Sequence, residues 1–260
     1  MKALFTAATG MDAQQTQISV IANNLANINT TGFKSSRAVF EDLLYQTIEE
    51  PGSSTSSGVA RPSPYQIGSG VRTVSTPSNF TQGVLEQTSR DKDVAIEGDG
   101  FFQVQLPGNQ TGYTRSGSFS VDPTGQLVTQ AGDVIQPPVT GLTGVQNLTI
   151  GSDGTVSGIS QGGTDVTELG QIYLFTFPNS SGLTSLGKNT YAATVASGDA
   201  AQVTPGQDGS GTLRQGFLEG SNVNVAEELI KMVLAQRSFE MNSKVVRTSD
   251  EMMNAMNQMR

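Results

Sequence analysis

MKALFTAATGMDAQQTQISVIANNLANINTTGFK (residues 1–34) carries an apolar side chain at every seventh position. The four members of this line are Leu4, Met11, Ile18 and Leu25, and Ala7 or Ala8, Ile21 or Ala22, and Ile28 fall between them. Such spacing predicts a helix over residues 1–30 with a narrow apolar seam, of the kind that packs against another helix. Gly10 lies inside the helix and costs about 1 kcal/mol relative to alanine. Gly32 suits the left-handed position past a helix C-terminus, so the run is expected to end there.

A second heptad pattern at the other end of the chain supplies a partner for this helix. Residues 221–260 hold neither glycine nor proline after Ser221, and apolar side chains again recur every seven residues. The members are Val225, Met232, Phe239, Val246 and Met253, with Leu229 as the clearest intermediate position. Asn224 followed by Glu227 predicts an N-cap with an acidic first turn. A further apolar line on another face implies more than one neighbour; it consists of Val245, Met252, Met256 and Met259.

Between the helices the pattern changes to short runs of period two that are separated by turns. Residues 94–96 and 101–106 flank Gly98-Asp99-Gly100, which predicts two short strands about a turn, as in a hairpin. Further strands are expected at residues 113–115, 118–121, 126–128, 148–150, 171–177, 190–195 and 212–218. Many short strands at close spacing indicate a small antiparallel barrel or sandwich-like domain over residues 91–220. The expected fold class is α+β, with the terminal helices paired as a coiled-coil-like layer.

Residues 31–90 are expected to form an extended connector. The segment 40–44 fits either a short helical turn or an extended arm, and the pattern does not decide between them. Residues 49–70 are rich in Gly, Ser and Pro, which favours a flexible linker. The alternative is a stretch that orders only against a neighbouring molecule, with Tyr65 and Ile67 as its anchors.

Composition excludes several classes of function. The 260 residues include no histidine, cysteine or tryptophan. Without histidine the chain lacks the commonest general base and transition-metal ligand, and without cysteine it lacks thiolate sites. The net charge of −8 comes from the middle of the chain and is unsuited to binding nucleic acid. No apolar run approaches the length of a membrane span.

The carboxylates near the Gly-Asp-Gly turn are the only cluster that suggests chemistry. Asp91, Asp93, Glu97 and Asp99 do not meet the spacing of a calcium loop, and turn carboxylates are usually solvated. We therefore predict no enzyme, no catalytic or metal-binding residue and no cofactor.

Four stretches closely resemble the motifs of the bacterial flagellar rod and hook family. They are VIANNLANINTTGFK (20–34), KDVAIEGDGFFQV (92–104), YTRSGSFSVDPTGQLVTQAG (113–132) and EGSNVNVAEELIKMVLAQRSFEMNSKVVRTSDEMM (219–253). The chain length and AVFEDLLYQTI (38–48) are most similar to the members that build the distal rod. Proximal rod or hook subunits are the alternative within the family. A cell-wall hydrolase is a remote alternative, because the chain has no additional domain of that size.

This resemblance implies a structural subunit that self-assembles into a helical tube, transmits torque from motor to hook and forms part of the export channel. The helical seams would be subunit interfaces, ordered only in the assembly. Residues 46–70 would be a rod-type insert that braces neighbouring subunits, which replaces the linker interpretation. Its contact residues would be Tyr45, Ile48, Tyr65 and Ile67.

The implied partners are other copies of the chain, proximal rod proteins, the hook or hook–rod junction, the P- and L-ring proteins as a bushing, and the flagellar export apparatus. The implied location is the periplasm-spanning rod of the flagellar basal body, reached without a cleavable signal peptide.

Overall fold

The computed structural model describes residues 2–51, 62–160, 166–207 and 209–259. The chain forms two compact units. A helical unit contains residues 1–25, 36–77 and 224–260, and a β unit contains residues 26–35 and 78–223. The chain therefore passes from one unit to the other four times, twice on each side of residues 36–77.

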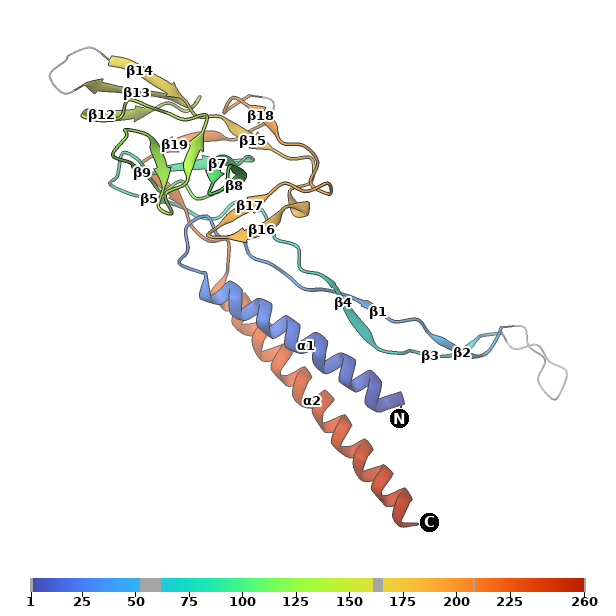
Figure 1. Ribbon diagram of the computed structural model, residues 1–260. Helices are drawn as coiled ribbons and strands as arrows, with labels where there is room; N and C mark the ends of the chain where they lie inside the picture. Colours follow the sequence, from blue (N-terminus) through green and yellow to red (C-terminus); the bar gives the residue numbers. More distant parts are fainter. Residues whose placement is uncertain (1, 52–61, 161–165, 208, 260) are drawn as a thin grey trace. The chain divides into compact units, whose positions relative to one another are not determined.

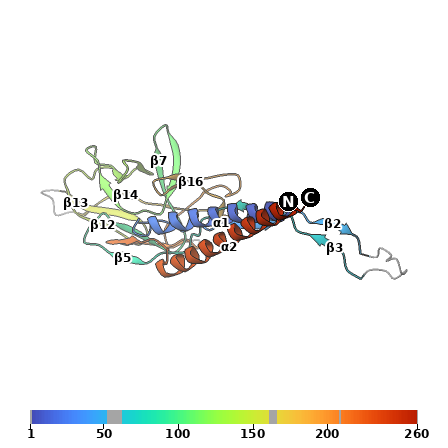
Figure 2. The same ribbon diagram turned by 90° about the horizontal axis from the view of Figure 1, so that it is seen from below.

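Two long helices form the helical unit, as predicted. Helix α1 (Lys2–Ala26) and helix α2 (Val225–Gln258) run antiparallel and side by side (Figures 1 and 2). Asn224 caps α2, because its side-chain oxygen accepts a hydrogen bond from the backbone N–H of Ala226 at 3.0 Å. Helix α1 ends earlier than its glycine signal suggests: Gly32 has a φ of 71° but lies beyond a turn that follows Ala26.

An extended two-stranded arm completes the helical unit. Strand β1 (Val39–Asp42) pairs with β4 (Val71–Ser75), and β2 (Gln46–Glu49) pairs with β3 (Tyr65–Ile67), both antiparallel. The segment around Phe40 is thus an arm and not a helical turn. Residues 52–61 of the expected insert lie outside the described residues.

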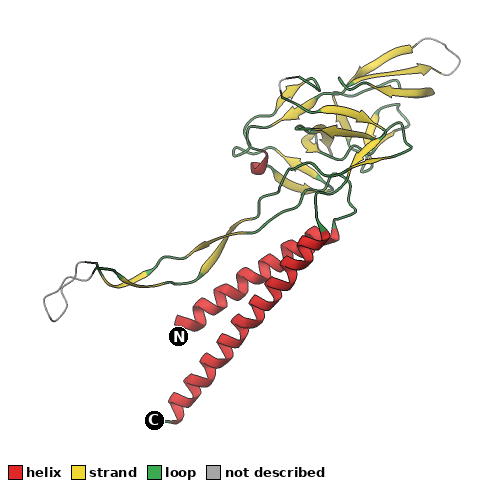
Figure 3. Ribbon diagram, turned by 180° about the vertical axis from the view of Figure 1, so that it is seen from behind, coloured by secondary structure: helices red, strands yellow, loops and turns green. Residues whose placement is uncertain are grey.

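The β unit is built from antiparallel pairs of short strands (Figure 3). Its largest sheet has seven strands in the order β16-β17-β8-β7-β11-β10-β9, and a three-stranded sheet has the order β12-β13-β14. Two-stranded pairs are β15-β18, β19-β6 and β20-β5. The strands are β5 (Leu85–Gln87), β6 (Val94–Glu97), β7 (Phe102–Leu106), β8 (Gln110–Thr114), β9 (Phe119–Val121), β10 (Leu127–Thr129), β11 (Val134–Gln136), β12 (Val145–Ile150), β13 (Thr155–Ser160), β14 (Val166–Gln171), β15 (Leu174–Thr176), β16 (Thr184–Gly187), β17 (Thr190–Ala192), β18 (Ala201–Val203), β19 (Thr212–Gln215) and β20 (Phe217–Glu219), with a 3-10 turn η1 (Ser180–Gly182). The α+β fold class is confirmed.

The expected hairpin about Gly98-Asp99-Gly100 is wrong in its pairing. Strands β6 and β7 both form, but β6 pairs with β19 and β7 pairs with β8 and β11. The turn packs against another loop instead, since Gly211 N–H donates to the Asp99 carbonyl at 2.7 Å. A side chain at position 98 would lie 2.8 Å from the Gly211 Cα, so this close approach requires glycine.

Two apolar clusters fill the β unit. The larger holds aliphatic side chains and the Phe102–Phe119 ring pair, whose centroids are 5.1 Å apart. The smaller is aromatic and consists of Phe101, Tyr113, Phe175 and Tyr191 with Phe80 and Phe177 packed against them. Edge-to-face ring pairs of this kind contribute about 0.5–1.5 kcal/mol each beyond the area they bury.

Candidate assembly surfaces and a buried charge cluster

Two contacts define the register of the helical hairpin. Near one end, Asn24 Nδ2 donates to Glu228 Oε2 at 3.2 Å, and both side chains are buried. Further along, Gly10 lies against Asn242, whose Nδ2 would be 2.8 Å from a Cβ at position 10. The two contacts lie two heptads apart on each helix. Gly10 therefore leaves room for the Asn242 amide, which gives a reason for a residue that weakens α1 locally.

The predicted apolar seams lie beside this line of contact and remain partly exposed. Leu4, Met11, Ile18, Leu25, Met232, Phe239 and Val246 are half-buried, whereas Val225, Leu229 and Met253 are exposed. Helix α2 buries Glu228, Ala235 and Ser249 more deeply than any of its large apolar side chains. These small or polar residues also recur at multiples of seven, but a search for apolar periodicity does not detect them.

A second apolar line runs along α2 and is exposed. Leu234 is 58% and Met241 62% exposed, and the members are Ile230, Leu234, Met241, Val245, Met252, Met256 and Met259. Helix α2 also continues past the N-terminal end of α1 (Figures 1 and 3). Within the described part of the chain, nothing covers these side chains, so α2 presents a free apolar face.

The arm exposes apolar side chains as well. Leu44 is 91% exposed, Tyr45, Ile48 and Tyr65 are about half exposed, and Ile67 is half-buried. The base of the arm is held against α1, where Val71 N–H donates to Thr9 Oγ1 at 3.4 Å and Lys2 Nζ donates to Gln46 Oε1. A two-stranded ribbon is only marginally stable in water, so these contacts with α1 support it.

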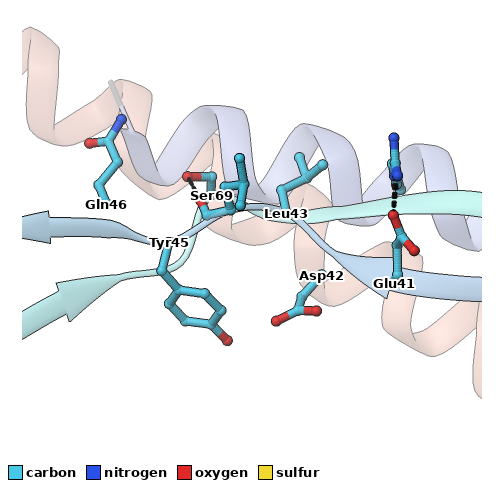
Figure 4. A pocket seen from close by; sticks show the side chains of 8 residues that line it. Glu41, Asp42, Leu43, Tyr45, Gln46 and Ser69 are labelled. Atoms are coloured by element: carbon cyan, nitrogen blue, oxygen red, sulfur yellow. Dashed lines mark hydrogen bonds and ion pairs between the residues drawn. The ribbon is translucent and has the colours of Figure 1, made fainter.

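A hollow of about 650 Å³ lies where the two strand pairs of the arm meet. Figure 4 shows the side chains that line it. Tyr45 and Asp42 point to one side of the ribbon, while an ion pair joins Glu41 to Arg72. Ser69 Oγ donates to the Leu44 carbonyl at 2.7 Å. This bond joins the segment between β1 and β2 to the segment between β3 and β4. The hollow combines an aromatic ring with carboxylates, which suits protein contact better than catalysis.

A fully buried charge cluster lies in the β unit. Lys34 Nζ donates to Glu219 Oε1 at 2.6 Å, and neither side chain is exposed. Arg115 is almost fully buried; its Nη1 lies 3.5 Å from Glu219 Oε2 and its Nη2 lies 3.9 Å from Asp99 Oδ1. Burial lowers the pKa of Lys34, and the Glu219 carboxylate opposes that shift. One buried carboxylate thus serves two buried cations.

The cluster ties together three segments of the β unit that adjoin the helical unit in the sequence. Lys34 Nζ also donates to the Thr81 carbonyl at 2.8 Å, and Gly83 N–H donates to Glu219 Oε1 at 2.9 Å. Asn222 reinforces the tie, because its Oδ1 accepts from Ser35 N–H at 2.7 Å. The sequence favours pairing of Arg115 with a carboxylate, and this is confirmed, but it did not point to Lys34, Glu219 or Asn222. The available signal was a lysine at the end of one motif and a glutamate at the start of another.

Three of the four carboxylates considered for chemistry, those of Asp93, Glu97 and Asp99, have structural partners. Thr88 Oγ1 donates to buried Asp93 at 2.8 Å, and Glu97 lies 3.6 Å from Arg214. Among residues 2–51, 62–160, 166–207 and 209–259, no group of three or more acidic, histidine or cysteine side chains could hold a metal ion. The described helices include none with the length and apolarity required to cross a membrane.

Three family models match the chain in order. Residues 4–34 match "Flagella basal body rod protein", residues 95–158 match "Flagellar hook protein FlgE/F/G D1 domain", and residues 214–259 match "Flagellar basal body rod FlgEFG protein C-terminal". These matches cover both helices and the start of the β unit.

Several full-length relatives are similar to the chain. The flagellar basal-body rod protein FlgG of Buchnera aphidicola (subsp. Acyrthosiphon pisum) is 52% identical over 98% of both chains. FlgG of Borreliella burgdorferi is 44% identical over 100% of this chain and 99% of its own. The flagellar basal-body rod protein FlgF of Caulobacter vibrioides is 34% identical over 94% of this chain and 92% of its own.

Proposed function

Because the chain belongs to the flagellar basal-body rod protein family, we propose that it is the structural subunit of the distal segment of the rod. Identical subunits that add head to tail form an open helical tube when the rotation between them does not close. The tube transmits torque from the motor to the hook and encloses part of the export channel.

The exposed apolar line on α2 carries this proposal. A helix with one buried and one exposed apolar face has a second neighbour, and burying that face recovers about 25 cal/mol per Å² of apolar surface. We infer that this line and the partly exposed seams contact adjacent subunits. Since the exposed line of α2 is buried only on docking, the helices gain further stability there, which makes growth conditional on neighbours.

The exposed side chains of the arm support a second contact. Tyr45, Ile48 and Tyr65 extend from a ribbon whose base is fixed on α1. We infer that the arm braces neighbouring subunits and stiffens the rod. Deleting residues 46–65 then yields a more flexible filament in electron micrographs, whereas a filament of unaltered stiffness would contradict the brace.

The remaining partners follow from the position of a distal rod. They are the proximal rod proteins, the hook or hook–rod junction, the P- and L-ring proteins and the flagellar export apparatus, in the periplasm. The acidic middle of the chain lies in the β unit, and we infer that its charge limits adhesion to the surrounding rings.

A charge placed on the free face of α2 tests assembly without disturbing the fold. Met241→Asp leaves the free chain about as stable as before, within roughly 0.5 kcal/mol, because the side chain is exposed. Filament growth measured by sedimentation should nevertheless be lost, since a carboxylate would be buried without a partner. Gln236→Asp adds the same charge at another exposed position of α2 and serves as the control.

A proximal rod subunit is the second candidate, favoured by the similarity to FlgF over most of both chains. The two candidates differ in where the protein adds. A fluorescently tagged chain that stops at the proximal segment of isolated basal bodies would favour the second candidate.

A further inference from the structure

The face that α1 presents to α2 carries polar side chains among buried apolar ones such as Ala7 and Ile21. Asn24 and Glu228 meet at one end, and Gly10 and Asn242 meet two heptads away. The same antiparallel register places Gln17 opposite buried Ala235, and Ala3 opposite buried Ser249. Ile21, three residues before Asn24, is only 1% exposed, so buried apolar side chains alternate with these polar contacts.

A heptad seam built only from apolar residues tolerates a shift by one heptad, because similar side chains meet again after seven residues. The line between α1 and α2 does not tolerate it. Shifting α2 by one heptad places Asn24 opposite Ala235 and leaves Glu228 without Asn24. It also moves Asn242 away from Gly10, the position that has no side chain to obstruct it.

Asn24 is anchored independently of α2. Its Oδ1 accepts from Ser36 N–H at 2.9 Å, and its Nδ2 also donates to the Ser36 carbonyl at 2.8 Å. Glu228 is held in turn by Lys231, whose Nζ donates to Glu228 Oε1 at 2.8 Å. Both halves of the contact are thus positioned before they meet, so they can select one register.

We propose that this line, composed of Gly10, Asn24, Glu228 and Asn242, is a register lock for the helical hairpin. A shift by one heptad would displace α2 along α1 by about 10 Å. The lock gives every subunit the same stagger, with the last turns of α2 always beyond the N-terminus of α1. Resting on the proposed function, this inference adds that subunits with slipped hairpins cannot join the tube.

Cysteine cross-linking in the free chain tests the register, because the natural sequence has no cysteine. Ala3→Cys with Ser249→Cys reports the observed register, and Ala3→Cys with Met256→Cys reports a shift of one heptad. In the natural background we expect the first pair to oxidise about tenfold faster than the second. Each cysteine pair is then introduced into two variant backgrounds. The first carries both Asn24→Leu and Asn242→Leu, and the second carries Asn242→Leu alone, which keeps the Asn24 contacts.

With both leucines present we expect the two pairs to oxidise at rates within about threefold of each other, since an apolar seam accepts either register. Asn242→Leu alone should give an intermediate ratio. An unchanged tenfold preference in both backgrounds overturns the proposal. Loss of both cross-links overturns it as well, because the polar residues would then be needed for pairing itself.

Filament growth separates this inference from the proposed function. Addition of the double leucine variant, without cysteines, to preformed filament ends should fall at least tenfold. Normal filament growth by a variant that forms both registers would show that assembly does not need the register lock, and it would leave the proposed rod function unchallenged.

Discussion

Glu219→Gln removes one charge from the buried cluster of the β unit while retaining nearly the same shape. In the native chain the Glu219 carboxylate accepts from Lys34 at 2.6 Å and from Gly83 N–H at 2.9 Å, and it lies 3.5 Å from Arg115. The amide still accepts one of these bonds. It leaves Lys34 and Arg115 buried, with exposed Asp99 as the remaining carboxylate near Arg115.

Breaking a buried ion pair by removing one partner costs about 3–5 kcal/mol, because the remaining charge stays desolvated. Here two cations share the lost carboxylate, so the upper part of that range applies. For a unit of this size, 1 kcal/mol lowers the Tm by about 2–4 °C. The variant should therefore melt roughly 10–15 °C below the natural chain.

Near-ultraviolet circular dichroism of the tyrosines follows this transition without depending on the helices, because neither helix contains tyrosine and Tyr113, Tyr173 and Tyr191 lie in the β unit. Glu97→Gln is the matched control, because Glu97 and Arg214 form an exposed pair in the same unit and such pairs contribute about 0–1 kcal/mol. Equal shifts for the two variants would refute the reasoning. They would mean that the buried cluster contributes no more than a surface pair.

Three further predictions concern other parts of the molecule. Burial raises the pKa of Tyr191 from 10.0 to about 12. The contribution of Tyr191 to stability is therefore complete below pH 10 and is lost as the pH rises toward 12. Tyr191→Phe should remove about 3 kcal/mol of this alkaline destabilisation, measured by urea unfolding at pH 9 and pH 12. Gly117→Ala would place a Cβ 1.6 Å from the Val94 carbonyl oxygen, so we expect a loss of about 3 kcal/mol in the same assay; an unchanged midpoint would contradict this close approach. Phe239→Asp should reduce the helical circular dichroism signal and abolish filament growth, because Phe239 is half-buried in the hairpin; retention of both would place this residue outside any interface.

The two helices could be predicted from the sequence because heptad spacing is a local signal. Part of their packing could be predicted as well, since the intermediate seam positions Ala7 and Ile21 are buried. The polar contacts could not, because Asn24, Glu228 and Asn242 carry no hydrophobic signal. Leu229, the predicted intermediate position, is exposed, and its neighbour Glu228 is buried.

Most strand positions in the β unit could likewise be predicted, because alternation and turn residues are local signals. The strand partners could not be predicted in this way. Turn chemistry at Gly98 suggested that neighbouring strands pair, but β6 pairs with β19 from the far end of the unit. Lys34 and Glu219 are 185 residues apart, so no pattern within a motif could have joined them. Pairings of this kind depend on the packing of the whole unit.

An image reconstruction of the assembled filament tests the central claim that α2 presents its free face to neighbouring subunits. We expect Leu234, Met241 and Met252, which are exposed in the free chain, to be buried against helices of adjacent copies. A reconstruction in which these side chains face solvent, while other surfaces hold the subunits together, would contradict it.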